Sequence, residues 1–318
     1  GKNDAGQRLD RFVAKNLPLL PPALLQKYIR LKRIKVNGKG SKRDVRLETG
    51  DILQLYINDE FFDKPNEENL FLTVFKPQLN IVYEDDNLLL VDKRPGMSVH
   101  ADETEKVNTL INHIQAYLYQ KREWNPKWEN AFAPALCNRI DRNTGGIVIA
   151  AKNAESLRIM NSQMKQRTNL KKFYLCVCHG IMERDSGLLE GYLLKDEKKN
   201  TVKILKHPCD GAKEIRTKYK VLGRDYDKQL SLVEVELMTG RTHQIRAHFA
   251  SIGHPLLGDG KYGTNKLNKD FGYRKQFLYS YKLVFMFDES AGILSYLHSR
   301  EFEVKDVWFK REFENGTL

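Results

Sequence analysis

The segment 138–151 constrains the fold of this chain more than any other part of the sequence. Its second half, 147–151, is an unbroken apolar run, which is typical of a strand buried on both faces. Its first half is polar and places Asp141 between two arginines, ahead of Gly145 and Gly146. Paired glycines allow a positive φ or a close approach of two backbones. The segment therefore predicts a polar loop held against a sheet, and on these residues alone a salt-bridged loop acid is the simpler interpretation of Asp141.

Strand-like runs alternate with a few helical ones from residue 81 to the end of the chain. Two apolar runs, 81–83 and 88–91, flank a turn-like acidic segment and predict a hairpin. Further strands are expected at 173–178 and 232–237, and helices at 109–120 and 154–166. We therefore expect residues 81–318 to form an α+β domain built around a mainly antiparallel mixed sheet.

Residues 1–58 are expected to form a small α/β domain of their own. One amphipathic helix is indicated by Leu9, Phe12 and Val13, and a second by Leu24, Leu25, Tyr28 and Ile29 after the helix-starting Pro21 and Pro22. A strand at 34–36, a turn at Asn37-Gly38 and a strand at 52–56 follow. Residues 59–80 then change from basic to acidic and carry two prolines, which predicts a linker.

The charge balance favours a polyanionic partner. The chain has 53 Lys and Arg against 41 acidic residues, a formal charge of +12, and such an excess releases counterions when it contacts phosphate backbones. Eight basic residues and no acid lie between residues 27 and 43: Lys27, Arg30, Lys32, Arg33, Lys35, Lys39, Lys42 and Arg43. A solvated charged face is the common meaning of such a run, but on a compact helix-and-hairpin unit we favour a phosphate-binding surface.

The apolar segments and the cysteines bear on where the protein works. No apolar run approaches the roughly 20 residues that span a bilayer, and the first residues lack the apolar core of a signal peptide. We therefore expect a cytoplasmic protein with no membrane partner. The four cysteines, Cys137, Cys176, Cys178 and Cys209, suggest neither a disulfide framework nor a metal pair, and we expect reduced, buried thiols.

A second polar segment, 239–248, leads into a short helix. Thr242 is expected to cap this helix and Gly253 to end it. Its buried face is expected to consist of Ile245, Phe249 and Ile252. Arg246 lies about 100° from Ile245 around the helix, so it can reach a carboxylate at the edge of the core.

No cofactor is expected. His243, His248 and His254 lie close together in the sequence, but their spacing is not that of a zinc motif, and neither a cysteine nor a carboxylate completes a ligand set. The chain also has no phosphate-binding P-loop and no dinucleotide-binding glycine pattern. We therefore predict no metal site and no cofactor.

Two long motifs resemble those of the RluA-type pseudouridine synthases, the group that includes ribosomal large subunit enzymes. The first is Arg139-Ile140-Asp141-Arg142 with Thr144 and Gly146. The second is Gly240-Arg241-Thr242-His243-Gln244-Ile245-Arg246, continued by Gly253-His254-Pro255 and Gly258-Asp259. Residues 5–58 resemble the S4 RNA-binding domain, with Arg8-Leu9-Asp10-Arg11, Ile34-Lys35-Val36-Asn37-Gly38 and Gly50-Asp51 matching its pattern.

The resemblance implies a role for each matched residue. Asp141 falls on the essential aspartate of the family, Tyr174 on its active-site tyrosine, and Arg246 on the arginine that pairs with the aspartate and would keep it ionised. Strand alternation independently places Tyr174 on the face opposite its neighbours. RNA contacts are expected from two groups of residues: Lys27, Arg30, Lys32, Arg33 and Lys35 in the S4-like domain, and Arg139, Arg142, Arg241 and His243 near the aspartate.

Two departures from the family pattern and the choice of substrate stay open. Asn138 replaces the usual histidine and Gly145 the usual small hydroxyl residue, which leaves the contacts of the loop with RNA undefined. The resemblance implies isomerisation of uridine in RNA, with large-subunit (23S) ribosomal RNA as the first expectation and transfer RNA as the second. A noncatalytic RNA-binding or ribosome-assembly protein is the alternative. A monomer suffices for the isomerisation.

Overall fold

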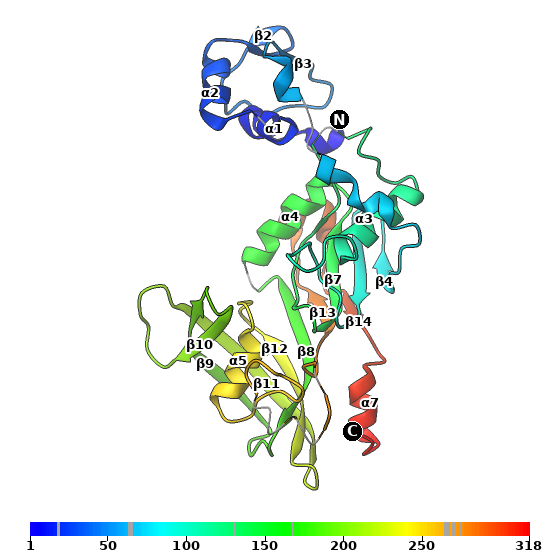
Figure 1. The fold of residues 1–318 in the computed structure, drawn as a ribbon, viewed down its shortest axis with the longest axis vertical. Helices are drawn as coiled ribbons and strands as arrows, with labels where there is room; N and C mark the ends of the chain where they lie inside the picture. Colours follow the sequence, from blue (N-terminus) through cyan, green and yellow to red (C-terminus); the bar gives the residue numbers. More distant parts are fainter. Residues whose placement is uncertain are drawn as a thin grey trace.

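The computed structural model describes residues 1–17, 20–62, 66–129, 131–166, 168–263, 268, 271–273 and 275–318. In Figure 1 these residues form an elongated molecule with the first part of the chain at one end. None of the helices in these ranges combines the length and the apolar character that crossing a membrane requires.

The first part of the chain has its own small sheet and its own apolar core. Its elements are η1 (Lys2–Asp4), α1 (Leu9–Asn16), α2 (Pro22–Arg30), β1 (Ile34–Val36), β2 (Lys39–Gly40) and β3 (Leu53–Leu55). Strand β1 pairs with both β2 and β3 in antiparallel register, and Leu9, Leu25 and Ile34 are buried beneath them. Asn37 and Gly38 both have positive φ, as a two-residue hairpin turn requires.

Eleven strands of the described chain form one large sheet. Its path is β10-β9-β11-β12-β8-β13-β7-β5-β4, with β14 beside β13 and β6 beside β7. The strands are β4 (Ile81–Glu84), β5 (Leu88–Lys93), β6 (Ala135–Leu136), β7 (Gly145–Ala151), β8 (Leu170–His179), β9 (Ser186–Asp196), β10 (Thr201–Leu205), β11 (Lys213–Asp225), β12 (Leu230–Leu237), β13 (Leu278–Phe285) and β14 (Glu301–Glu303). All pairings are antiparallel except β13 with β7, so the expected α+β class with a mainly antiparallel mixed sheet is confirmed.

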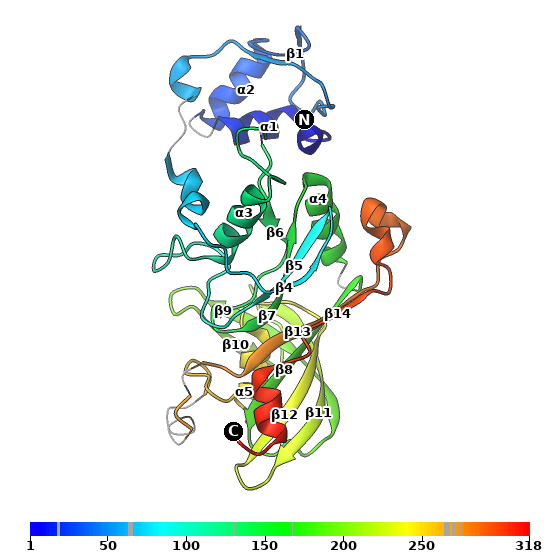
Figure 2. The same cartoon turned by 90° about the vertical axis from the view of Figure 1, so that its right-hand side faces the viewer.

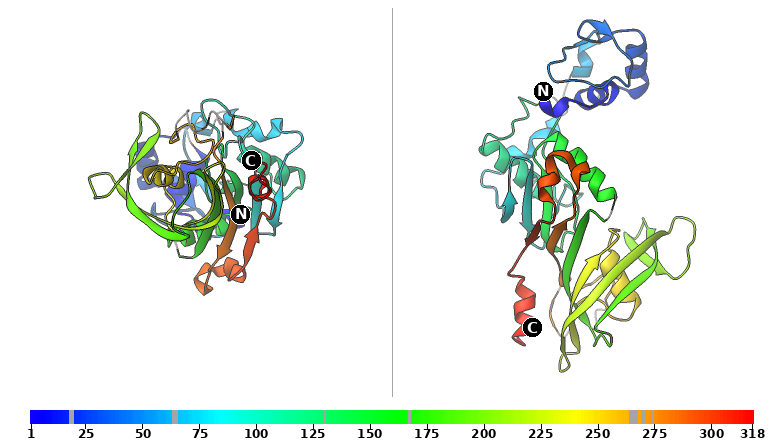
Figure 3. Two further views of the ribbon diagram at one scale, coloured as in Figure 1. Left: turned by 90° about the horizontal axis from the view of Figure 1, so that it is seen from below. Right: turned by 180° about the vertical axis from the view of Figure 1, so that it is seen from behind.

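Helices cover the two halves of this sheet. They are α3 (Leu110–Gln120), α4 (Ala154–Lys165), α5 (Gln244–Ser251), η4 (Glu289–Leu297) and α7 (Trp308–Glu314). Helices α3 and α4 lie over the half that contains β4, β5 and β7 (Figure 2). In the other half the strands β9 to β12 curve around α5 (Figure 3), and Ala247 packs among Leu193, Val202 and Ile215 there.

The segment between the two sheets is only partly extended. Residues 63–65 of the predicted linker lie outside the described residues. The flanking parts form η2 (Asp59–Phe62) and η3 (Asn66–Thr73). Phe71 is buried against Trp124, with ring centroids 5.0 Å apart, so the end of this segment belongs to the core of the larger sheet.

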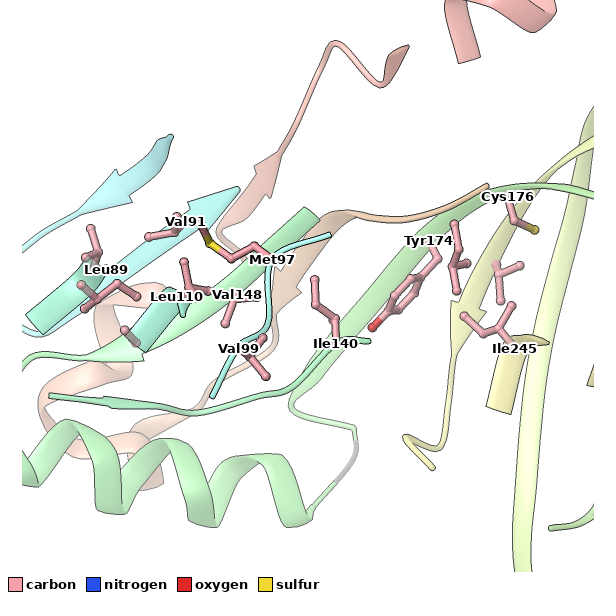
Figure 4. Packing of buried hydrophobic residues seen from close by; sticks show 14 of the residues in the cluster. Leu89, Val91, Met97, Val99, Leu110, Ile140, Val148, Tyr174, Cys176 and Ile245 are labelled. Carbon is pink, nitrogen blue, oxygen red and sulfur yellow. The ribbon is translucent and has the colours of Figure 1, made fainter. Parts of the chain in front are cut away.

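One apolar cluster runs along one face of the large sheet, across both of its halves. It extends from Leu89 and Val148 through Ile140 to Tyr174 and Ile245 (Figure 4). Cys176 and Cys178 lie in this core and all four cysteines are free. The expectation of buried thiols is confirmed for Cys176 and Cys178 and is wrong for Cys209, which is exposed, while Cys137 is half-buried. The loop that carries Asp141 reaches this face between the two halves of the sheet.

Candidate active site

The loop 137–144 enters the large sheet at β7, and both glycines at the start of this strand are needed for its path. A Cβ on Gly146 would lie 2.2 Å from the carbonyl oxygen of Ser280 on β13, and the φ of Gly146 is +114°. A Cβ on Gly145 would lie 2.3 Å from the ring of Tyr279, whose hydroxyl donates to Asp92 at 2.6 Å. The predicted close approach is therefore real, and the departure at Gly145 leaves room for the ring of Tyr279.

Lys93 fixes the backbone of this loop through hydrogen bonds. Its Nζ donates to the carbonyl oxygens of Arg94, Met97 and Arg142 at 2.9–3.1 Å. Burial lowers the pKa of Lys93 to about 7, while the three acceptors match the three donors of an ammonium group. The side chain of Asn138 also binds backbone, because its Oδ1 accepts from the amide of Ile149 at 2.8 Å.

Asp141 forms part of a three-residue charge network. Nη1 of Arg246 donates to Oδ2 of Asp141 at 2.9 Å. Another edge of the guanidinium, formed by Nε and Nη2, donates to both oxygens of Asp259, at 2.7 and 2.9 Å. Burial by itself would raise the pKa of Asp259, but the hydrogen bonds and charge of Arg246 outweigh it and leave this pKa lowered. Asp259 is fully buried and Asp141 is 29% exposed, so only Asp141 can meet a substrate.

The start of α5 differs from the prediction. Thr242 does not cap the helix: the N-cap residue is His243, whose φ is +52°, and no side chain accepts a capping bond there. Instead, Oε1 of Gln244 accepts from the amide of Arg241 at 3.1 Å and from the hydroxyl of Thr239 at 2.8 Å. Ile252 was also misplaced, because it is the C-cap residue and is 38% exposed. The predicted end at Gly253 agrees with its φ of +86°.

His243 faces Asp141 as a consequence of this turn. Its Nδ1 lies 2.9 Å from the hydroxyl of Tyr262, and its Nε2 lies 3.8 Å from Oδ2 of Asp141. Burial lowers the pKa of His243, so the contact with Asp141 is that of a neutral imidazole at neutral pH. Tyr262 also lies beneath Arg246, with its ring centroid 5.3 Å from the guanidinium carbon.

Tyr174 completes the group on the sheet side. It lies on β8 and is buried, and its hydroxyl points toward Ile140 of the loop (Figure 4). Its face of β8 is the one shared with Cys176, whereas Phe173 and Leu175 pack in a different core, so the predicted alternation holds. Burial raises the pKa of Tyr174 to about 12, and the phenol stays protonated at neutral pH.

A cavity of about 870 Å³ joins these residues. Asp141, Tyr174 and Arg246 line it, as do the predicted RNA-binding residues Arg139, Arg142, Arg241 and His243. A volume of this order accommodates a nucleotide with part of its neighbours. The site residues predicted around Asp141 are thus brought together, although they come from segments far apart in the sequence.

Arg142 and Arg139, two of the predicted RNA-binding residues that line the cavity, differ in how they are engaged. Arg142 donates to Ser98 and to both oxygens of Asp102, at 2.7–3.2 Å, which ties the loop 98–104 to the Asp141 loop. Arg139 is exposed. Arg142 therefore acts first as a support of the loop, whereas Arg139 is free to face solvent.

The other histidines do not converge on a common point. Nδ1 of His248 lies 3.0 Å from the hydroxyl of Thr217, and Nδ1 of His254 lies 2.9 Å from the carbonyl oxygen of His179. Over the described ranges, no cluster of three or more His, Cys, Asp or Glu side chains is arranged to hold a metal ion.

The predicted RNA-binding residues of the first part of the chain lie apart from this cavity. Lys27 and Arg30 project from α2, Lys32 lies in the following turn, and all three are exposed. Arg33 and Lys35 lie over the rings of Tyr28 and Tyr56, at 5.5 and 5.1 Å. The part of the chain that carries these five residues lies at one end of the molecule (Figure 1).

Sequence reasoning did not assign three residues that shape the site: Asp259, Tyr262 and Lys93. A signal existed for Asp259, because Gly258-Asp259 belongs to the second motif. A Cβ on Gly258 would lie 2.2 Å from a backbone oxygen, so this glycine marks the turn that aims Asp259 inward. Nothing in the sequence around Lys93 or Tyr262 indicates the partners that the fold gives them.

Comparison with known proteins places this arrangement in context. Residues 87–251 match the family described as RNA pseudouridylate synthase. An uncharacterized RNA pseudouridine synthase of Mycoplasma genitalium is 32% identical over 317 residues, covering 97% of this chain and 96% of that protein. The ribosomal large subunit pseudouridine synthase C of Vibrio parahaemolyticus is 30% identical over 288 residues, covering 88% and 85%. The solved structure of human RNA pseudouridylate synthase domain containing 4 is 19% identical, covers 75% and 92%, and matches the fold with a TM-score of 0.58.

Proposed function

The chain belongs to the RNA pseudouridylate synthase family and is an RNA pseudouridine synthase, and from this premise we propose that it isomerises uridines of large-subunit ribosomal RNA with Asp141 as its catalytic carboxylate. The observation that carries the proposal is the ion pair between Asp141 and Arg246 at 2.9 Å, in one cavity with Tyr174.

The reaction needs a nucleophile or base and little else. The bond between N1 and C1′ breaks, the uracil turns, C5 bonds to C1′, and the proton of C5 is lost while N1 gains one. No electrons enter or leave. The carboxylate of Asp141 assists either by adding covalently to the sugar or base, or by removing a proton from C2′.

Arg246 and Asp259 would keep Asp141 in position. A guanidinium has N–H donors along more than one edge, so it can bind the buried carboxylate of Asp259 and the reactive carboxylate of Asp141 at the same time. Because Asp259 holds one edge of the Arg246 guanidinium, Nη1 points at Asp141 before substrate arrives. The side chain therefore does not need to reorganise during the reaction. His243, neutral and held by Tyr262, limits the freedom of Asp141 on its remaining side.

The target uridine has to leave its stack to reach Asp141. The cavity is lined by Tyr174, by Leu278 and by the loop that carries Asp141. In our proposal the uracil rests against the ring of Tyr174, and the high pKa of this phenol keeps it a neutral, apolar surface. Arg139, exposed at the edge of the cavity, contacts the RNA outside.

The choice of RNA rests on the relatives and on the basic N-terminal surface. Large-subunit ribosomal RNA is favoured because relatives that cover most of the chain are named for that substrate. We propose that residues 1–58 are an S4-like RNA-binding domain, joined through 59–80 to a catalytic domain over 81–318, and that one chain suffices because every site residue comes from it.

Mapping pseudouridines tests this proposal. Total RNA from cells with and without the gene is compared by carbodiimide modification and primer extension, with rescue by the unaltered gene or by Asp141→Asn. The proposal predicts loss of defined stops in large-subunit ribosomal RNA that only the unaltered gene restores. Lost stops in transfer RNA would transfer the activity to that substrate, and an unchanged map would favour an RNA-binding role without catalysis.

A further inference from the structure

Lys172 and Arg241 line the cavity, and the side chains of both lack an ion pair with any described residue. Lys172 lies on β8, two residues before Tyr174 and on the same face of that strand, and Arg241 lies just before α5. Nε of Arg241 is buried without a hydrogen-bond partner in the described part of the chain. Within the same ranges, Nζ of Lys172 takes part in no hydrogen bond or ion pair.

The amine of Lys172 lies close to the turn that carries Arg241. A Cβ placed on Gly240 would lie 3.8 Å from Nζ of Lys172, so the amine lies beside the backbone that leads into Arg241. Burial lowers the pKa of Lys172, and no charged neighbour raises it. Glycine at 240 leaves the space between the amine and this turn open.

Apart from Arg139, which is exposed at the edge of the cavity, the other cations that line it are already engaged. Arg246 binds Asp141 and Asp259, Arg142 binds Asp102, and Nζ of Lys261 donates to the carbonyl oxygen of Asn200 at 2.9 Å. A buried charge without a partner is costly and is normally neutralised or paired. Lys172 and Arg241 are half-buried, line one cavity and have no side-chain partner among the described residues, so they can bind an anion that the protein does not supply.

We propose that Lys172 and Arg241 together bind one backbone phosphate next to the target uridine, which fixes the sugar over Asp141 while the base turns. The inference rests on the proposed function and adds a specific subsite to it. A planar guanidinium and a point-like ammonium complement each other on a phosphate, since one binds two oxygens and the other a third. Holding the sugar at a phosphate matters in this reaction because the base is detached from C1′ midway.

A single neutral linkage in the RNA tests the pairing. The substrate is an RNA whose modification by the unaltered protein has been established by the mapping above, so failure of the proposed function is seen before this experiment begins. One methylphosphonate is placed in turn at each linkage from two before to two after the target uridine. Its neighbouring 2′-O-methyl group, which keeps it stable, is also present in the matched phosphodiester RNA. Affinity and single-turnover rate are measured for each RNA.

At one linkage, the neutral methylphosphonate should reduce the catalytic efficiency of the unaltered protein (single-turnover rate divided by dissociation constant) about tenfold, as expected for loss of a charge-assisted contact. Lys172→Met and Arg241→Gln should each lower the catalytic efficiency about tenfold on the phosphodiester RNA. On the RNA with the neutral linkage each variant should lose less than about twofold more, because the phosphate charge that the side chain would bind is already missing. Lys171→Met, an exposed neighbour on β8, is the matched control and should keep the full sensitivity to the neutral linkage.

Two results would overturn the inference. One is an unaltered protein that is indifferent to the neutral linkage at every position, a result that does not depend on the folding of any variant. The other is that, at every linkage, the loss caused by the substitution and the loss caused by the neutral linkage multiply. This would mean that Lys172 and Arg241 do not contact the altered phosphate. Recovery of the sensitivity in Lys172→Arg and Arg241→Lys would support it further, because both keep the charge.

Discussion

The two basic regions of this molecule use their charges in opposite ways. In the first part of the chain, Lys27, Arg30 and Lys32 are exposed and form no ion pair with any described residue. In the cavity, the side chain of Arg246 is 8% exposed and is bound by two carboxylates. Exposed cations can exchange counterions for phosphates, whereas a buried and paired cation orients its neighbours. Basic charge alone therefore says little about a role until its partners are known.

The largest effect should follow from disturbing the buried pair. Arg246→Met leaves Asp259 buried without its cation, so we expect the free energy of unfolding to fall by about 3–5 kcal/mol and the rate of isomerisation to fall roughly 1000-fold. Denaturant unfolding and single-turnover assays measure the two effects. Adding Asp259→Asn to this variant should restore much of the stability and none of the rate. Recovery of the rate would show that Arg246 serves only the fold.

Acid should affect the two regions unequally. Burial lowers the pKa of His248 to about 4, whereas the free side chain titrates near 6.5. The unfolded chain therefore binds this proton first, and stability that is complete above pH 6.5 is lost as the pH falls toward 4, by about 3 kcal/mol. His248→Gln should flatten that part of the curve for the large sheet. Residues 1–58 contain no histidine, so an equal loss in their unfolding, or an unchanged slope in the variant, would contradict this account.

The smallest effect on chemistry should come from the exposed cations. Reversing Lys27, Arg30 and Lys32 to Glu should weaken RNA binding about tenfold or more and flatten its dependence on salt, with the rate at saturating RNA unchanged. Reversing Lys305, Lys310 and Arg311 near α7, at the other end of the molecule (Figure 1), is the matched control. If both sets weaken binding equally, the N-terminal surface has no special role.

Local signals in the sequence were enough for most of the fold. The helix expected at 109–120 begins after Thr109, whose side chain accepts from the amide of Asn112, and the strand expected at 147–151 lies in β7. These elements depend on the period of their own apolar residues and on their own caps. The strand order and the single parallel pair could not be predicted, because they depend on contacts between distant segments.

The same limit explains what was found and missed in the site. The motifs predicted Asp141, Tyr174 and Arg246 as site residues, and the structure places all three in one cavity. The cap at Thr242 was wrong because Gln244 satisfies the turn and lets His243 adopt a left-handed conformation that a local pattern does not reveal. The anchoring of Arg246 by Asp259 and the unpaired state of Lys172 depend on which side chains meet in three dimensions, and only the structure contains that information.

The most direct test of the central role of Asp141 is release of tritium from RNA labelled at C5 of uridine, under single-turnover conditions, with Asp141→Asn compared with the unaltered protein. The substitution keeps the size of the side chain and removes its charge. Our account predicts no detectable release by Asp141→Asn, with RNA affinity within about threefold of the unaltered protein, since contacts of basic residues with phosphates supply most of that affinity. Release at a normal rate would contradict it.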